Sequence, residues 1–90
     1  ALHEIRHGDK QEQLSRRERD LLHYFIQNKN TILTRDQLLK EVWGYKKGVT
    51  TRTVDTHVLT IRKKLQDNAQ NPMFIQTLHG VGYKFIGNEK

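Results

Sequence analysis

The chain has 90 residues, a formal net charge of +6 and no cysteine. One hydrophobic core fits this length, and without cysteine neither a disulfide framework nor a thiolate metal site can form. No apolar run approaches the roughly 18 to 20 residues that cross a bilayer, and the start shows no secretory leader. We therefore expect one cytoplasmic domain over residues 1–90, with no cofactor, no metal and no membrane contact.

Residues 1–14 are expected to form part of a small sheet. The segment His7-Gly8-Asp9-Lys10 is a turn signal between two short polar runs, and this pattern is typical of a β-hairpin. Neither run can bury much apolar surface. The hairpin is therefore expected at the edge of a sheet whose other strands lie outside the chain.

Helical periodicity predicts a three-helix core over residues 15–66. The segment Ser15-Arg16-Arg17-Glu18 is a capping box ahead of a helix over residues 16–28, and Thr34-Arg35-Asp36-Gln37 is a second one. Gly44 stands at the natural end of the second helix. The apolar stripes of these helices are Leu21, Leu22, Phe25 and Ile26 in the first, and Leu38, Leu39, Val42 and Trp43 in the second.

A loop over residues 44–50 separates these helices from a third one, predicted over residues 51–66, whose apolar stripe is Val54, Val58, Ile61 and Leu65. Alternating patterns then predict a hairpin over residues 74–86. Its tip, His79-Gly80-Val81-Gly82, contains two glycines that allow the positive φ angles of a tight turn.

The positive charge is concentrated around the third helix. Six basic residues lie between positions 46 and 64 against the single acid Asp55, so this segment carries +5 of the net +6. A localised charge of this kind attracts a polyanion. A solvated basic surface remains the alternative at this point.

The outer face of the third helix predicts the type of partner. Opposite the apolar stripe lie Arg52, Thr56, Leu59, Thr60 and Lys63, with Thr53, His57 and Lys64 on the flank. An ordinary solvated face carries interspersed Glu and Lys. The major groove of a duplex admits one helix and offers hydrogen-bonding groups and thymine methyls, to which threonine and leucine are suited, while cations reach phosphates. For Leu59 alone, a lone surface leucine is an equally good interpretation.

Four segments, in order and at the right spacing, resemble the OmpR/PhoB family of bacterial two-component response-regulator output domains. They are Leu14-Ser15-Arg16-Arg17-Glu18, residues 34–44, residues 52–65, and Ile75-Gln76-Thr77-Leu78-His79-Gly80-Val81-Gly82-Tyr83-Lys84-Phe85. The resemblance implies an α+β winged helix-turn-helix fold, with a three-helix core, a C-terminal β-hairpin wing and a truncated N-terminal β-hairpin. It also implies sequence-specific binding of double-stranded DNA and regulation of transcription at the output of a phosphorelay.

The resemblance also implies roles for single residues. Arg52, Thr53, Arg62 and Lys63 or Lys64 match positions that contact the DNA backbone. Asp55, Thr56 and Thr60 match positions that face bases, with His57 beside them. Thr77, His79 and Tyr83 match wing positions near phosphate or the minor groove, over residues 77–83. Tyr45, Lys46, Lys47 and Gly48 match the loop that meets RNA polymerase in activators, and family members usually bind direct repeats as homodimers.

The chain departs from the family pattern at three points. Leu59 and Thr60 stand where many members carry arginine, His79 replaces a frequent wing arginine, and only about half of the N-terminal sheet can be formed. No receiver domain with its phosphorylatable aspartate is present in the sequence.

Two other classes of function fit the sequence less well than DNA binding. An enzyme or metal site is disfavoured because His3 and His7 have no third ligand at motif spacing and no phosphate-binding glycine loop precedes a helix. A protein–protein interaction module that uses the winged-helix face is the alternative that Leu59 leaves open.

Overall fold

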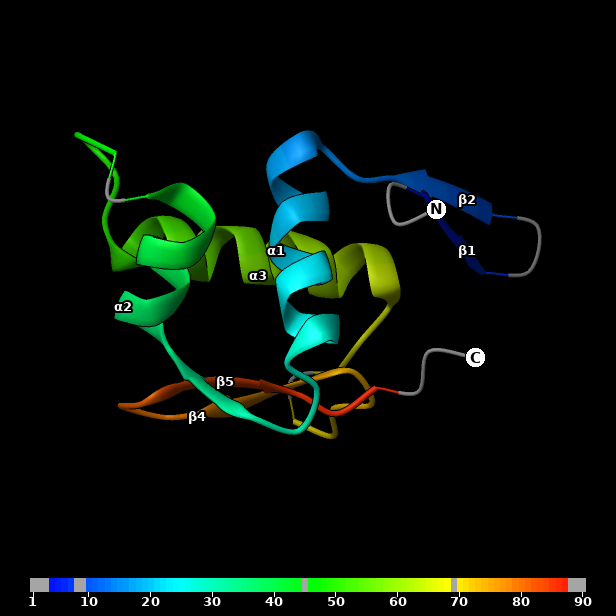
Figure 1. Ribbon diagram of the computed structural model, residues 1–90. Coiled ribbons are helices and arrows are strands. Elements are labelled where there is room, and N and C mark those ends of the chain that lie inside the picture. The colour runs from blue at the N-terminus through cyan, green and yellow to red at the C-terminus, as the bar shows by residue number, and fades with distance from the viewer. Residues whose placement is uncertain (1–3, 8–9, 45, 69, 88–90) are drawn as a thin grey trace.

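The computed structural model describes residues 4–7, 10–44, 46–68 and 70–87. Its elements are β1 (Glu4–His7), β2 (Lys10–Gln13), α1 (Arg16–Gln27), β3 (Ile32–Thr34), α2 (Arg35–Leu38), the π-helical segment η1 (Leu39–Trp43), α3 (Thr51–Leu65), β4 (Ile75–Leu78) and β5 (Gly82–Phe85). In Figure 1 the helices lie over one face of the sheet formed by β3, β4 and β5, and the β1–β2 hairpin extends to one side. No helix within these described ranges is long and apolar enough to span a membrane.

The predicted N-terminal hairpin is confirmed as an antiparallel pair in which Glu4 aligns with Gln13 and His7 with Lys10. The predicted turn at Gly8 and Asp9 lies outside the described residues, as does His3. The hairpin contacts α3 as well as leading into α1, because Lys64 Nζ donates to the Gln13 carbonyl at 2.8 Å.

The capping box at the start of α1 is confirmed. The Glu18 amide donates to Ser15 Oγ at 3.2 Å, and the Ser15 amide donates to Glu18 Oε1 at 2.9 Å. Two otherwise unpaired amides are satisfied by these bonds, which fixes where the helix begins. The helix ends at Gln27, one residue earlier than predicted, because Asn28 leaves the helical conformation with a φ of −116°. The Asn28 side chain donates to the Tyr24 carbonyl at 2.9 Å and so caps this end.

The second helix differs from its prediction in two ways. Only half of the predicted capping box forms: the Gln37 amide donates to Thr34 Oγ1 at 3.0 Å, but the Gln37 side chain donates to Tyr24 Oη instead of returning to Thr34. The helix also widens from α to π geometry after Leu38. It ends at Gly44, as predicted, with a φ of +67° that glycine adopts without strain.

The third helix buries the predicted stripe. Val54, Val58 and Ile61 are at most 1% exposed and Leu65 is 8% exposed. Its last helical residue is Leu65 rather than residue 66, because Gln66 takes a left-handed conformation with a φ of +57°. The helix therefore faces the core along its whole length and leaves its opposite face outside.

The wing sheet has three antiparallel strands in the order β3-β5-β4. The hairpin strands β4 and β5 lie within a residue of their predicted positions, whereas β3 was not predicted. In β3, Leu33 is fully buried and aligns with Tyr83 of β5. Phe25 of α1 packs on this sheet, edge-on to Tyr83 at 6.5 Å between ring centroids and stacked on Phe85 at 6.4 Å.

Asp67 orders the connection between α3 and the wing. Its carboxylate accepts hydrogen bonds from the amides of Met73 at 2.7 Å, Phe74 at 3.2 Å and Ile75 at 2.9 Å. Charge-assisted bonds to backbone amides are stronger than neutral ones. The wing is therefore fixed to the end of α3 as well as to the core.

Candidate nucleic-acid interface

The outer face of α3 is exposed along its length. Arg52, Thr56, Leu59 and Lys63 are exposed and Thr60 is half-buried. Leu59 retains 54% of its surface. This stripe lies opposite the buried one, so the placement that the periodicity predicted for these five residues is confirmed.

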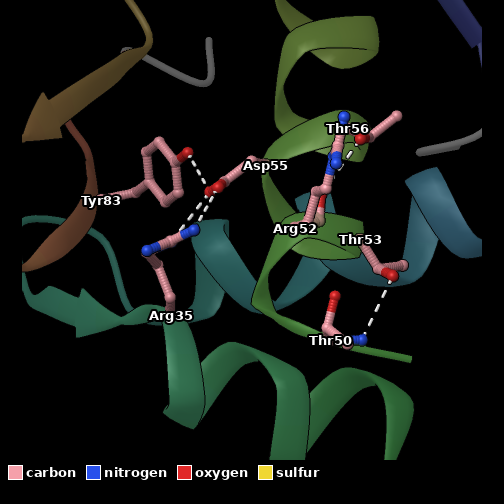
Figure 2. A network of polar contacts seen from close by, with 7 residues as sticks. All are labelled: Arg35, Thr50, Arg52, Thr53, Asp55, Thr56 and Tyr83. Atoms are coloured by element: carbon pink, nitrogen blue, oxygen red, sulfur yellow. Dashed lines mark hydrogen bonds and ion pairs between the residues drawn. The ribbon is translucent and has the colours of Figure 1, made fainter. Parts of the chain in front are cut away.

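Both threonine hydroxyls of this face donate to the helix itself. Thr56 Oγ1 donates to the Arg52 carbonyl at 3.0 Å, and Thr60 Oγ1 donates to the Thr56 carbonyl at 3.1 Å. The first of these bonds is drawn in Figure 2. Each hydroxyl hydrogen is thereby bonded to a carbonyl of the helix. The oxygen lone pairs and the methyl group of each threonine remain available to a ligand.

Asp55 takes part in a network of intramolecular bonds, although its side chain stays 36% exposed. Arg35 of α2 donates to both carboxylate oxygens, through Nε to Oδ1 at 3.0 Å and through Nη2 to Oδ2, and Tyr83 Oη donates to Oδ1 at 2.6 Å. Figure 2 shows Arg35 and Tyr83 converging on Asp55 from two other elements. Burial, together with the bond to Asp55, raises the pKa of Tyr83 to about 12. The network ties α2, α3 and the wing together.

Arg62 was expected to contact a DNA phosphate, and the structure places it inside instead. The residue is only 8% exposed. Its Nη2 donates to the Ile75 carbonyl at 2.7 Å and to Thr77 Oγ1, and the guanidinium lies 5.7 Å from the centroid of the Tyr83 ring. Arg62 therefore joins α3 to β4 and β5. The wing residues Thr77 and Tyr83, which were expected near the DNA, make these internal contacts too.

Lys64 contacts the N-terminal part of the domain. Its Nζ donates to Glu18 Oε1 at 2.7 Å and to the Gln13 carbonyl at 2.8 Å. Burial alone raises the pKa of Glu18, but the bonds from Lys64 and the Ser15 amide outweigh it and leave this pKa below its usual value. The ammonium expected at a phosphate thus joins the end of α3 to the last residue of β2 and to the first turn of α1.

Two flanking residues shape the start of α3. Thr53 Oγ1 accepts from the Thr50 amide at 3.3 Å, as Figure 2 shows. His57 is half-buried: its Nδ1 lies 2.8 Å from the Thr53 carbonyl, and its ring meets Trp43 edge-on at 5.0 Å between centroids. Both side chains therefore have roles within the fold beside any outward contact.

The tip of the wing is exposed and faces the start of α3. His79 and Val81 are exposed, and Gly80 has a φ of +78°. A shallow cleft of about 230 Å³ lies between tip and helix; residues of both parts line it, among them Arg35, Asp55, Thr77, His79 and Tyr83.

The loop between η1 and α3 presents Lys46, Lys47 and Gly48 to solvent. Tyr45, expected to act with them, lies outside the described residues. Lys46 also lines a shallow cleft of about 310 Å³ with Arg16, Arg17 and Asp20 of α1. The loop therefore shares a surface with the first turn of α1.

Sequence reasoning missed two residues that organise this surface. Arg35 was assigned only to a helix start, yet it holds Asp55 from 20 positions away along the chain. Glu18 was assigned only to its capping box, yet it also binds Lys64. Neither contact has a local sequence signal, because each joins elements that are distant in sequence.

Three helices followed by a β-hairpin that packs beside the third helix define a winged-helix domain. Residues 9–85 match the family described as "Transcriptional regulatory protein, C terminal". Because this match covers most of the chain, the chain belongs to that family. The resemblance to OmpR/PhoB output domains is confirmed.

Individual relatives agree with this assignment. The chain is 52% identical over 71 residues to the transcriptional regulatory protein VxrB of Vibrio cholerae, covering 79% of this chain and 27% of that protein. It superposes on the DNA-binding domain of Klebsiella pneumoniae RstA, solved with the RstA box, with a TM-score of 0.77 and 34% identity over 92% of this chain and 82% of that one. It superposes on DrrB, a Thermotoga maritima OmpR/PhoB homologue, with a TM-score of 0.72 and 29% identity over 94% of this chain and 45% of that one.

The chain spans about a third of the length of the curated relatives that it matches. The fold and family of this part are established by these matches.

Proposed function

We propose that the domain binds double-stranded DNA sequence-specifically, with α3 in the major groove and the wing against the backbone or the minor groove. One observation carries the proposal: the exposed stripe of α3 holds two cations, two threonines and a leucine, and the one acid of the helix is held by internal bonds. A helix face of this composition fits the floor and walls of a major groove. The relative RstA was solved with its DNA box.

In this proposal the two ends of the stripe and its centre contact different parts of the DNA. Arg52 and Lys63 hold phosphates, while Thr56, Leu59 and Thr60 face bases. His79 brings the wing tip to the backbone. Asp55, Arg62, Lys64 and Tyr83 act indirectly, since their internal bonds set the position of α3 relative to the wing and the N-terminal hairpin.

Three further proposals follow from the family. The domain acts as the output of a bacterial response regulator in the cytoplasm, where a receiver domain controls it. It pairs as a homodimer on direct repeats. The loop with Lys46, Lys47 and Gly48 contacts RNA polymerase, which its exposure next to Arg16 supports. In all three proposals the domain binds another macromolecule and catalyses no reaction.

Binding as a function of salt tests the central proposal. Duplexes selected from a random pool are titrated by fluorescence anisotropy at several salt concentrations. Affinity should fall steeply with salt, because each neutralised phosphate contributes about 0.9 to the log–log slope. Lys63→Ala should reduce the slope by about that amount, whereas Arg16→Ala, which removes an exposed cation of α1, should leave it unchanged.

Lack of binding to any duplex in dilute buffer contradicts the proposal. A partner bound through Leu59 with little dependence on salt would instead support the protein-interaction alternative, since apolar contacts are insensitive to counterion release.

A further inference from the structure

The centre of the exposed α3 stripe lacks hydrogen-bond donors. Thr56, Leu59 and Thr60 lie three and four residues apart, so they share one face. Leu59 contributes only apolar surface, and 54% of that residue is exposed. The hydroxyl hydrogens of Thr56 and Thr60 are used on helix carbonyls. What this centre offers a ligand is methyl and methylene surface together with oxygen lone pairs.

The donors of the stripe stand at its two ends. Arg52 and Lys63 are exposed there, one turn before Thr56 and one turn after Leu59. Asp55 is the one acidic side chain of the helix, and Arg35 and Tyr83 hold its carboxylate. No charged side chain therefore stands at the centre of this face to bond a base.

The four base pairs differ in how they meet such a surface. In the major groove guanine presents only the acceptors N7 and O6, which need donors from the protein. Thymine presents its C5 methyl, and its partner adenine presents the N6 amino donor. A G·C pair also presents a donor, cytosine N4, so the acceptor oxygens of this centre can accept from either pair. Only an A·T pair adds a methyl group that can pack against the apolar surface of the centre.

We infer that the domain selects A·T pairs at the centre of each half-site by contact of Leu59 with a thymine methyl, flanked by Thr56 and Thr60. This inference rests on the proposed function. Guanine is not favoured at these central positions, because none of the three side chains donates to its N7 and O6 acceptors. The recognised ligand class is duplex DNA with thymine at a defined major-groove position.

Replacing thymine by deoxyuridine tests the inference, because only the C5 methyl is lost. The duplex recovered with highest affinity from a random pool is resynthesised with uracil at one thymine position at a time. At one or two central positions affinity should fall about fourfold, which corresponds to one buried methyl group. Leu59→Ala should bind the parent duplex more weakly and bring the thymine-to-uracil ratio at that position close to one.

Lys63→Ala is the matched control, since it removes a cation from the same face. It should weaken the thymine and uracil duplexes equally and keep the fourfold ratio. Equal affinity of parent and uracil duplexes at every position overturns the inference, while salt-dependent DNA binding still supports the proposed function. An unchanged ratio in Leu59→Ala overturns the assignment to Leu59. Loss of all DNA binding in the parent chain overturns both proposals.

Discussion

Arg62→Ala should destabilise the fold rather than remove a phosphate contact. A hydrogen bond from a charged group contributes on the order of 1.5 to 3 kcal/mol, and Arg62 Nη2 serves two acceptors, the Ile75 carbonyl and Thr77 Oγ1. Its Nε is buried without a hydrogen-bond partner in the described part of the chain, which offsets part of this gain. We expect a net loss of about 2.5 kcal/mol, because the Ile75 carbonyl would lose its arginine donor. For a domain of this size that lowers Tm by roughly 10 to 20 °C.

Urea denaturation and salt-dependent anisotropy, measured on the same variants, separate the two roles. Lys63→Ala should change the free energy of unfolding by less than about 0.5 kcal/mol, as for other exposed positions, and reduce the salt slope by about one phosphate. Arg62→Ala, measured where it is folded, should keep the parent slope. Arg62→Lys keeps the charge but loses the fork geometry, so it should be destabilised as well. An Arg62→Ala variant that is as stable as the parent and has a smaller slope would show that Arg62 holds a phosphate.

Three further predictions concern stability. The pKa of Tyr83 is raised to about 12, so the free energy of unfolding should fall as pH rises from about 10 to 12, by up to about 1.4 kcal/mol per pH unit; Tyr83→Phe should remove this slope in urea titrations. The pKa of Glu18 is lowered, so its contribution to the free energy of unfolding is fully present above pH 4.5 and is lost as the pH falls through the folded-state pKa. Glu18→Gln should therefore flatten the acid side of the profile of stability against pH. Gly82→Ala would place Cβ 2.0 Å from the Leu33 carbonyl oxygen and should cost at least about 2 kcal/mol in urea denaturation; Gly80→Ala, with open space but a φ of +78°, should cost about 1 kcal/mol.

Elements defined by local signals were predictable from the sequence. The bonds between Ser15 and Glu18 join residues three apart, so the capping box could be recognised directly. The buried stripe of α3 follows from helical spacing. The strand β3 has only three residues, of which Leu33 alone is buried, and its identity depends on bonding to β5. No periodicity can indicate a strand of that length.

The helical spacing indicated a partly buried position for Arg62, but its positive charge led to the prediction of a phosphate contact. Positions 58, 61, 62 and 65 follow the spacing of one helix face, so Arg62 lies at the edge of the buried stripe. Its charge pointed to a phosphate, because the chain supplies no local sign that the Ile75 carbonyl lies within reach. Asp55 is a similar case: its partners Arg35 and Tyr83 are 20 and 28 positions away. Asp55 and Arg62 are thus two side chains predicted at the interface that also join elements distant in the sequence.

The division of α3 into held and exposed side chains has a practical consequence for protein engineering. Asp55, Arg62 and Lys64 bond to other parts of the domain, whereas the side chains of the exposed stripe contribute little to packing. A combinatorial library that varies positions 52, 56, 59, 60 and 63 can therefore explore new binding preferences without loss of the scaffold. Libraries that also vary positions 55 or 62 would mostly yield variants that fold poorly.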